Sequence, residues 1–246
     1  MSKRILITGA SSGIGKALAL ELARRGHHLG LVARREEALK SIGDVIGREA
    51  PSIQIEIAGL DVTDYDAVPQ VVNDLAERLG GLDTIVVNAG IGLGEKIGRG
   101  DFGKAKQTIE VNLLGAMATV DAAVALFLQK GGGHVVGISS VAAFRGMPRG
   151  SSYSASKAGF ATYLEALRAE VLRKYIQVTV LYPGYIDTPL NDMLPSRPFL
   201  ISVEKGAAII ATLIEKKVKR STVPVFPWNV IGRVLKILPT GMIARM

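Results

Sequence analysis

Tyr153 and Lys157 are a pair of residues whose types and spacing suit a chemical reaction. They are four positions apart in a segment with helical patterning, so their side chains share one face. A free phenol has a pKa of about 10, and a nearby ammonium group stabilises the phenolate and lowers that pKa. The pair is therefore suited to proton transfer at a carbonyl or alcohol oxygen while a hydride moves at the carbon.

The spacing itself is common by chance, and its neighbours make it specific. Residues 151–159 read Ser-Ser-Tyr-Ser-Ala-Ser-Lys-Ala-Gly, and Ile138-Ser139-Ser140 closes a predicted strand upstream. A serine hydroxyl at the end of that strand is able to hold the substrate oxygen while the proton moves. Ser139 and Ser140 both meet this requirement.

A glycine-rich turn follows the first predicted strand and opens the first predicted helix. Gly9 permits a sharp turn, Gly13 lets the backbone approach a pyrophosphate, and Gly15 lets helix and strand pack closely. Exposed N–H groups and the helix dipole favour an anion there. The strand–turn–helix context indicates a dinucleotide rather than an empty turn. The predicted contacts are Thr8, Gly9, Ser11, Ser12, Gly13, Ile14 and Gly15.

The end of the second predicted strand indicates which nicotinamide cofactor binds. A carboxylate there would bind the ribose 2′-hydroxyl of NAD and repel a 2′-phosphate. The sequence instead has Ala33 followed by Arg34 and Arg35, and a guanidinium holds a phosphate through paired hydrogen bonds. We therefore predict NADP(H), bound by Arg34, with Arg35 either assisting or simply solvated.

Together these motifs resemble the single-domain members of the short-chain dehydrogenase/reductase family. The turn has the spacing T-G-x-x-x-G-x-G, and the resemblance extends over about residues 3–220. It implies that Tyr153 is the general acid/base and that Lys157 lowers its pKa and binds the nicotinamide ribose. It selects Ser140, thirteen residues before Tyr153, to orient the substrate oxygen. It also implies that Asn112 orders a water in the proton path.

The resemblance implies further cofactor contacts. Asp61 and Val62 would meet the adenine. Asn88-Ala89-Gly90 would line the cleft after the fourth strand, preceded by Val87 where the family often has asparagine. After the sixth strand, the backbone of Ile186 would bond the carboxamide of the nicotinamide, and Thr188 would cap that carboxamide. The matching residues of that segment are Pro183, Gly184, Ile186 and Thr188.

Apolar strands alternate with amphipathic helices along the whole chain. Strands that are apolar on both faces indicate a parallel sheet covered on both sides, and right-handed crossovers make it doubly wound. We therefore predict an α/β Rossmann fold of about seven strands in a single domain, 1–246. Within it, 1–135 is mainly the cofactor-binding half, 136–220 the catalytic and substrate half, and 221–246 a basic apolar tail. Strands are predicted at 5–8, 29–33, 53–57, 85–88, 135–139, 177–181 and 223–226, and helices at 14–25, 36–49, 63–79 (capped by Thr63), 102–129, 152–174, 203–218 and 228–238.

Composition excludes several classes of site. The chain has 246 residues and no cysteine, so disulfides and thiolate metal sites are excluded. His27, His28 and His134 lack metal-ligand spacing, so we expect solvated turn histidines and no metal. The first strand begins beside Met1, which leaves no room for a signal peptide, and no uninterrupted apolar run is long enough to span a bilayer. We expect a cytoplasmic protein.

The formal net charge of +8 gathers at one end of the chain. Residues 205–246 hold eight Lys or Arg and one acid, so the first 204 residues are close to neutral. A uniformly basic nucleic-acid binder would not show this distribution, and the scattered aromatic residues form no stacking platform for bases. We expect no nucleic-acid partner.

Residues 228–238 predict an amphipathic helix between Pro227 and Pro239. Two interpretations of its apolar stripe stay open. The stripe packs on its own domain or on a symmetry mate, or the segment 216–246 lies peripherally on an anionic membrane surface. The stripe comprises Trp228, Ile231, Val234, Leu235 and Leu238, with Arg233 and Lys236 outside it.

These motifs predict an NADP(H)-dependent oxidoreductase that interconverts a carbonyl and an alcohol. The apolar segment 190–201 is expected to cover the site and favours a lipophilic substrate; Pro189, Pro195 and Pro198 lie in or beside it. The resemblance implies a homo-oligomer, either a dimer or a tetramer. Two alternatives stay open: an NADPH-binding sensor or scaffold without turnover, and an epimerase or dehydratase of related fold, although those usually carry a longer C-terminal substrate domain.

Overall fold

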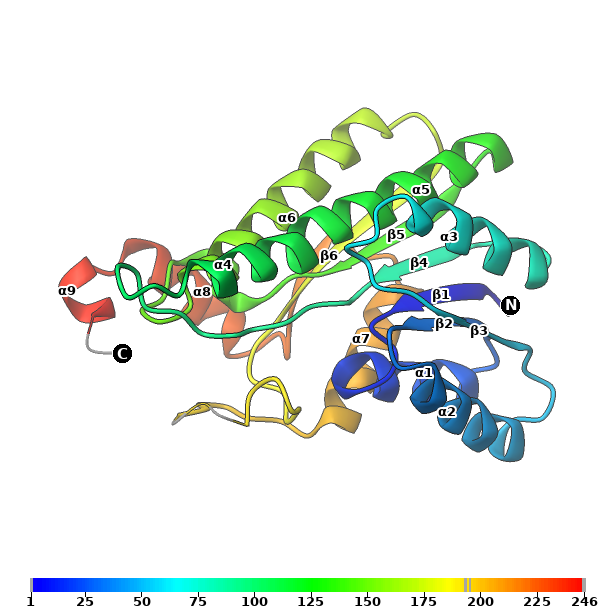
Figure 1. Ribbon diagram of the computed structural model, residues 1–246, viewed down its shortest axis with the longest axis horizontal. Coiled ribbons are helices and arrows are strands. Elements are labelled where there is room, and N and C mark those ends of the chain that lie inside the picture. Colours follow the sequence, from blue (N-terminus) through cyan, green and yellow to red (C-terminus); the bar gives the residue numbers. More distant parts are fainter. Residues whose placement is uncertain (1, 193, 195, 245–246) are drawn as a thin grey trace.

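Seven parallel strands form one sheet in the computed structural model, which describes residues 2–192, 194 and 196–244 (Figure 1). The strand order is β3-β2-β1-β4-β5-β6-β7, so the chain winds outward from β1 in both directions. The predicted α/β Rossmann fold is confirmed by this order. The strands are β1 (Arg4–Thr8), β2 (His28–Ala33), β3 (Ile55–Gly59), β4 (Thr84–Val87), β5 (Gly133–Ile138), β6 (Ile176–Pro183) and β7 (Arg220–Val223).

Helices cover both faces of the sheet. Figure 1 shows α1, α2 and α7 on one face and α3, α5 and α6 on the other, with α8 and α9 at the left-hand end of the molecule. A π-helical segment (Glu110–Gly115) joins α4 to α5, and a short 3₁₀ helix (Val141–Phe144) follows β5. The α-helices are α1 (Gly13–Arg24), α2 (Glu36–Glu49), α3 (Ala67–Arg78), α4 (Phe102–Ile109), α5 (Ala116–Lys130), α6 (Ser151–Glu170), α7 (Val203–Glu215), α8 (Trp228–Ile237) and α9 (Thr240–Ile243).

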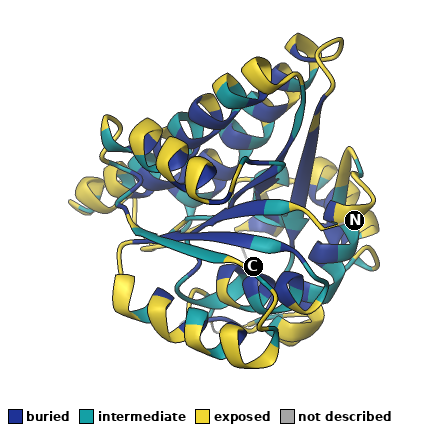
Figure 2. Ribbon diagram, turned by 90° about the vertical axis from the view of Figure 1, so that its right-hand side faces the viewer, coloured by how far each residue is buried: buried dark blue, intermediate teal, exposed yellow. Residues whose placement is uncertain are grey.

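The two faces of each strand supply two separate cores, because successive side chains of a strand point to opposite sides. Ile5 and Ile7 of β1 join the core made with α1, α2 and α7, whereas Leu6 joins the core made with α3, α5 and α6. Figure 2 shows buried residues on the strands and on the inner sides of the helices, and exposed residues on the outer sides. The continuous apolar strands of the sequence follow from this arrangement.

Two predicted elements were wrong in their placement. Thr63 does not cap the next helix: its backbone N–H and its hydroxyl both donate to Asp61 Oδ1, at 3.0 and 2.8 Å, and α3 begins only at Ala67. The seventh strand is Arg220–Val223 rather than 223–226. Pro224 has no N–H to offer to a strand ladder, so the strand ends before it.

The prediction of solvated histidines was wrong for two of the three. His134 is buried, its Nε2 lies 2.9 Å from Thr179 Oγ1, and burial lowers its pKa to about 4. His27 is also buried, and its Nδ1 accepts a hydrogen bond from the backbone N–H of Lys3 at 3.1 Å. Both side chains hold neighbouring strand ends together. In the part of the chain that the structure describes, no group of residues has a metal-binding arrangement.

Residues Phe102–Lys130 form one continuous helical stretch that is long and apolar enough, by length and composition, to cross a membrane. Half of its most apolar window is buried in the fold. Val120, Ala123 and Phe127 of α5 belong to the core shared with α3 and α6. The stretch therefore serves as a core helix of the sheet's covering layer.

The tail helix α8 packs on its own domain through part of the predicted stripe. Trp228 and Leu235 are buried, and Gly232 lies against the ring of Phe144. Val234, which the sequence places in the same stripe, is exposed instead. Pro195, in the segment 190–201 that was expected to cover the site, and Arg245, in the basic tail, lie outside the described residues.

Asp83, just before the start of β4, connects three elements through hydrogen bonds. Its Oδ2 accepts hydrogen bonds from the backbone N–H and Nε of Arg4, both at 2.9 Å, and its Oδ1 accepts one from Lys130 Nζ at 2.6 Å. Burial alone would raise the pKa of Asp83, but the hydrogen bonds from Arg4 and Lys130 outweigh it and hold that pKa well below its usual range. The ionised carboxylate thus joins β1, β4 and α5.

We predict that Asp83→Asn lowers the free energy of unfolding at pH 7 by about 1–3 kcal/mol, because the variant loses the charged carboxylate that accepts these hydrogen bonds. A depressed carboxyl pKa contributes stability that is fully present above the unfolded value of about 3.9 and is lost as the pH falls towards the folded value. Urea unfolding at several pH values should therefore show the difference between wild type and variant shrinking below about pH 4. A difference that stays constant down to acidic pH would contradict this assignment.

Candidate active site

The turn between β1 and α1 approaches the end of β4 closely because its glycines carry no side chain. Gly9 has a φ of +67°, and a Cβ at this position would lie 2.7 Å from the Cα of Ala89. A Cβ on Gly15 would overlap the carbonyl oxygen of Gly9. A side chain at either position would force the turn away from β4.

Asn88 fixes this approach with hydrogen bonds. Its Nδ2 donates to the carbonyl oxygens of Thr8 and Gly9, at 3.0 and 3.3 Å. In return, the hydroxyl of Thr8 accepts from the backbone N–H groups of Asn88 and Ala89, at 3.1 and 3.2 Å. The structure therefore joins the predicted phosphate turn to the Asn88-Ala89-Gly90 motif.

The start of α1 is free to receive an anion. Within the described residues, Ser12 at the N-cap makes no side-chain capping hydrogen bond and the first turn holds no acidic side chain. Unpaired N–H groups and the helix dipole then point at the turn, which fits a pyrophosphate. A Cβ on Gly13 would lie 3.5 Å from the side chain of Thr188, so the segment after β6 faces the same turn. Ser11 lies in the same turn, and Ile14 lies in the first turn of α1.

Arg34 and Arg35 follow β2 at the same edge of the sheet. Nη2 of Arg35 donates to Ser11 Oγ at 3.1 Å, which brings this guanidinium to the phosphate turn. Arg34 is exposed, and its Nη1 lies 3.6 Å from Asp61 Oδ2. Burial raises the pKa of Asp61, but hydrogen bonds from Thr63 and the charge of Arg34 outweigh it and lower that pKa. Both guanidinium groups are exposed to solvent, so a phosphate that binds here can reach them.

Ser140 and Tyr153 meet at the carboxyl end of β5. Tyr153 lies in the first turn of α6, close enough to Ser140 for the serine side chain to act on the phenol and lower its pKa. Ser139 is used differently, because its hydroxyl donates to the backbone oxygen of Lys157 at 2.9 Å. The structure thus distinguishes the two serines that the strand end offers.

Lys157, Asn112 and Gly90 converge beside the phenol. Nζ of Lys157 is buried, donates to the carbonyl oxygen of Ile138 at 2.9 Å, and lies 5.9 Å from the ring centroid of Tyr153. A Cβ on Gly90 would lie 3.3 Å from both Lys157 Nζ and Asn112 Oδ1. Glycine at position 90 therefore leaves room for the ammonium and the amide to sit side by side.

Asn112 lies in the π-helical segment, and its side-chain amide makes three hydrogen bonds. Its Oδ1 accepts from the backbone N–H of Ile91 at 2.8 Å, and its Nδ2 donates to Ile91 O and Ser156 Oγ at 2.8 and 3.2 Å. Single π-turns inside α-helices are frequent at functional sites. The segment ends at Gly115, where a Cβ would lie 2.7 Å from the carbonyl oxygen of Val62, so this end of the segment packs on the predicted adenine contact.

Burial dominates the protonation of both titratable groups. It raises the pKa of Tyr153, and the hydrogen bond with Ser140 offsets only part of that rise. It lowers the pKa of Lys157 to about 8. The sequence predicts that Lys157 lowers the pKa of Tyr153, whereas in the protein by itself desolvation moves the phenol pKa upward.

The segment after β6 closes the other side of the turn. The backbone N–H of Gly184, next to Pro183, donates to the carbonyl oxygen of Val223 at 2.9 Å. Ile186 is buried and forms an isolated bridge with Ile201, and Thr188 is buried beside the phosphate turn. All the predicted site residues therefore gather along the carboxyl ends of the strands, where open α/β sheets bind ligands.

Residues 3–198 match the family model of the short chain dehydrogenases. The chain belongs to this family. An uncharacterized oxidoreductase of Mycobacterium tuberculosis is 39% identical over 244 residues, which are 99% of this chain and 96% of that relative. As a family member, the protein is an oxidoreductase that acts on CH–OH groups with a nicotinamide cofactor.

Solved structures agree with the assignment to the short-chain dehydrogenases. The alcohol dehydrogenase of the archaeon Thermococcus sibiricus, complexed with 5-hydroxy-NADP, has a TM-score of 0.82 at 28% identity and covers 90% of this chain and 96% of its own. A short chain dehydrogenase of Mycobacterium paratuberculosis bound to NAD has a TM-score of 0.81, covering 92% and 98% of the two chains. It is 24% identical and shows the fold alone.

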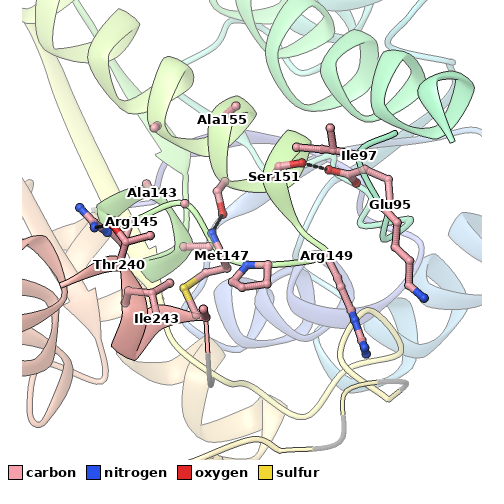
Figure 3. Close-up of a pocket in the computed structure, with 17 residues that line it drawn as sticks. Glu95, Ile97, Ala143, Arg145, Met147, Arg149, Ser151, Ala155, Thr240 and Ile243 are labelled. Atoms are coloured by element: carbon pink, nitrogen blue, oxygen red, sulfur yellow. Dashed lines mark hydrogen bonds between the residues drawn. The ribbon is translucent and has the colours of Figure 1, made fainter. Parts of the chain in front are cut away.

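Glu95 is a residue of this short-chain dehydrogenase that sequence reasoning missed. It is buried, and its Oε1 accepts a hydrogen bond from Ser151 Oγ at 2.6 Å (Figure 3). The same oxygen accepts a second hydrogen bond from the backbone N–H of Ser152 at 2.5 Å. These two serines open α6 and directly precede Tyr153. Glu95 is 56 positions from Ser151, so no local pattern in the sequence signals this helix cap.

The cavity in Figure 3 lies on the flank of α6 and has a volume of about 620 Å³. Glu95, Met147, Ala155 and Ile243 line it, whereas Tyr153 and Lys157 do not. On a helix, position 155 is turned well away from positions 153 and 157. The cavity is therefore separate from the catalytic side chains.

Trp228 is the second residue whose place the sequence does not reveal. A Cβ on Gly184 would overlap its indole ring, and its buried Nε1 has no hydrogen-bond partner among the described residues. The rings of Tyr185 and Phe199 meet it edge-on, with centroids at 5.7 and 6.0 Å. The first residue of the tail helix thus forms part of the wall next to the Pro183-Gly184 segment.

We predict that Glu95→Ala loosens the start of α6 and lowers the free energy of unfolding by about 1–2 kcal/mol, the usual effect of a lost helix cap. Glu95→Gln keeps one acceptor oxygen and should lose less. Hydrogen–deuterium exchange should rise in the first turn of α6 in the alanine variant. The matched control is Glu77→Ala, an exposed glutamate of α3, which should change neither quantity. Unchanged exchange at the start of α6 would refute the capping role.

Proposed function

We propose that this protein is an NADP(H)-dependent oxidoreductase that interconverts a carbonyl and an alcohol on a lipophilic substrate. The observation that carries the proposal is the meeting of Ser140, Tyr153, Lys157 and Asn112 at the carboxyl ends of the strands, beside a turn that fits a dinucleotide pyrophosphate. A nicotinamide cofactor, when bound, supplies or accepts the hydride.

Ser140 and Tyr153 act on the substrate oxygen. The Tyr153 phenol and the Ser140 side chain lie close together, so a substrate oxygen beside them can contact both hydroxyls. Ser140 holds that oxygen while the Tyr153 hydroxyl donates its proton as the carbon accepts hydride. In the alcohol direction the same phenol oxygen takes the proton back.

Burial of Tyr153 suits the reducing direction. Because burial raises the pKa of Tyr153, the phenol is protonated at neutral pH and is ready to act as an acid. The buried ammonium of Lys157 stabilises the phenolate that remains after transfer, and Asn112 holds the backbone of Ile91 beside it. Replacement of the lost proton is assigned to the Asn112 side, as the family resemblance implies.

The choice of NADP(H) rests on the end of β2. Ala33 leaves no carboxylate to bind a 2′-hydroxyl, Arg35 contacts Ser11 of the phosphate turn, and Arg34 lies beside Asp61. A 2′-phosphate would compete with Asp61 for Arg34.

The lipophilic substrate class is inferred from the side chains around Tyr153. A Cβ on Gly92 would lie 3.6 Å from the Tyr153 ring and 3.5 Å from Leu190, which brings the covering segment to the catalytic phenol. Phe199 of the same segment packs edge-on against Trp228. Apolar walls of this kind favour a nonpolar body with few polar groups.

Turnover distinguishes the enzyme from an NADPH-binding sensor. We expect NADPH oxidation with a panel of ketones from small and polar to long-chain and lipophilic, and a fall of roughly 100- to 10,000-fold in kcat for Tyr153→Phe. Affinity for NADPH should stay within a few-fold. Tyr163→Phe, on the same helix, is the matched control and should keep its activity. Tight NADPH binding without Tyr153-dependent turnover in either direction would favour the sensor.

Replacement of Arg34 tests the proposed preference for NADPH over NADH. We expect Arg34→Ala to weaken NADPH binding by roughly 10- to 100-fold, the effect of losing charged hydrogen bonds to a phosphate, and to leave NADH binding nearly unchanged. Fluorescence titration of the reduced cofactors measures both constants. Arg48→Ala, an exposed arginine of α2, serves as control. Equal losses for NADPH and NADH would defeat the assignment.

A further inference from the structure

The outer face of α8 carries apolar side chains that its own domain leaves uncovered. Val230, Val234 and Ile237 are 50%, 45% and 82% exposed, and their spacing of four and three residues places them in one row. The opposite face, with Trp228 and Leu235, is already buried against the domain. A soluble helix needs one apolar stripe to pack, and α8 has a second one.

The apolar surface extends before and after the helix. Phe226, two residues before α8, is 74% exposed, and Met242 of α9 is also exposed. Exposed apolar side chains scattered singly are ordinary, but a row of them with neighbours in the adjoining segments marks an interaction surface. We call Phe226, Val230, Val234 and Ile237 the α8 surface.

Cations flank the α8 surface. Arg233 and Lys236 are exposed on the helix, and a cleft of about 480 Å³ between α6 and α8 is lined by both of them and by Arg220 of β7. In the described part of the chain none of these three cations forms an ion pair, although Glu165 also lines the cleft. The sequence from 216 to 246 contains no Asp or Glu.

We propose that the α8 surface docks on an anionic lipid bilayer, with the apolar row in the headgroup–acyl boundary and Arg233, Lys236 and Arg220 towards the lipid phosphates. An apolar row beside cations, in a segment without acids, is the combination that interfacial helices use. The inference does not depend on the catalytic activity proposed above.

A second copy of the chain fits the α8 surface less well. In a two-fold dimer the same patch of both copies forms the interface, so Arg233 and Lys236 of both copies would gather in one contact area. The segment 216–246 offers no acid to compensate. Like charges brought together across an interface oppose association, whereas anionic lipids neutralise them.

Co-sedimentation of the full chain with vesicles tests the proposal. The vesicles are phosphatidylcholine alone or phosphatidylcholine with about one quarter phosphatidylglycerol, at low salt and at about 0.5 M salt. We expect binding only to the anionic vesicles, and a loss of at least roughly tenfold in affinity at high salt. No binding to anionic vesicles at low salt overturns the proposal.

Matched variants locate the contact. Ile237→Glu should lower vesicle affinity by roughly tenfold or more, whereas Leu172→Glu, at a site that is 77% exposed at the far end of α6, should not. Arg233→Gln with Lys236→Gln should lower affinity by roughly tenfold or more, whereas Lys216→Gln with Lys217→Gln, which removes equal charge away from α8, should lower it much less.

Two further results would overturn the proposal. Equal losses in the α8 variants and their controls would mean that net charge alone draws the protein to vesicles. Light scattering of the same variants tests the other occupant. If the wild-type protein does not bind vesicles and forms an oligomer that Ile237→Glu dissociates, the α8 surface contacts a second copy of the chain. Circular dichroism and NADPH binding confirm that each variant is folded.

Discussion

The close approach of the β1–α1 turn to the end of β4 is the constraint on which the rest of the site depends. It exists because Gly9 and Gly15 leave no Cβ in the contact, and because Asn88 and Thr8 exchange hydrogen bonds across it. The same approach leaves the start of α1 open towards the carboxyl ends of the strands. The phosphate site and the catalytic groups can therefore face one ligand.

A second close contact organises the proton-transfer groups. Gly90 leaves room for the Lys157 ammonium and the Asn112 amide on the same side, and the π-helical segment holds Asn112 against Ile91. Both catalytic groups are buried, so their pKa values move towards the neutral forms: upward for Tyr153 and downward for Lys157. A protonated phenol beside a buried lysine is an arrangement that suits the proton transfer proposed for this site.

The C-terminal helix α8 has two apolar faces, one packed on its own domain and one exposed. Its inner face brings Trp228 against Gly184 and, through Phe199, against the segment that covers Tyr153. Its outer face presents the α8 surface and its cations.

The sequence by itself determined the fold class, the phosphate turn and the Tyr153–Lys157 pair, because periodicity, glycine spacing and helical spacing are local properties. It also predicted most helix and strand positions. It failed where local competition or burial decides: Thr63 is held by Asp61, two residues away, instead of capping α3, and His27 and His134 are buried by neighbouring strands. Glu95 at the start of α6 and Trp228 at Gly184 are contacts between segments far apart in the chain. Only the tertiary structure could assign them, because desolvation and long-range hydrogen bonds have no local pattern in the sequence.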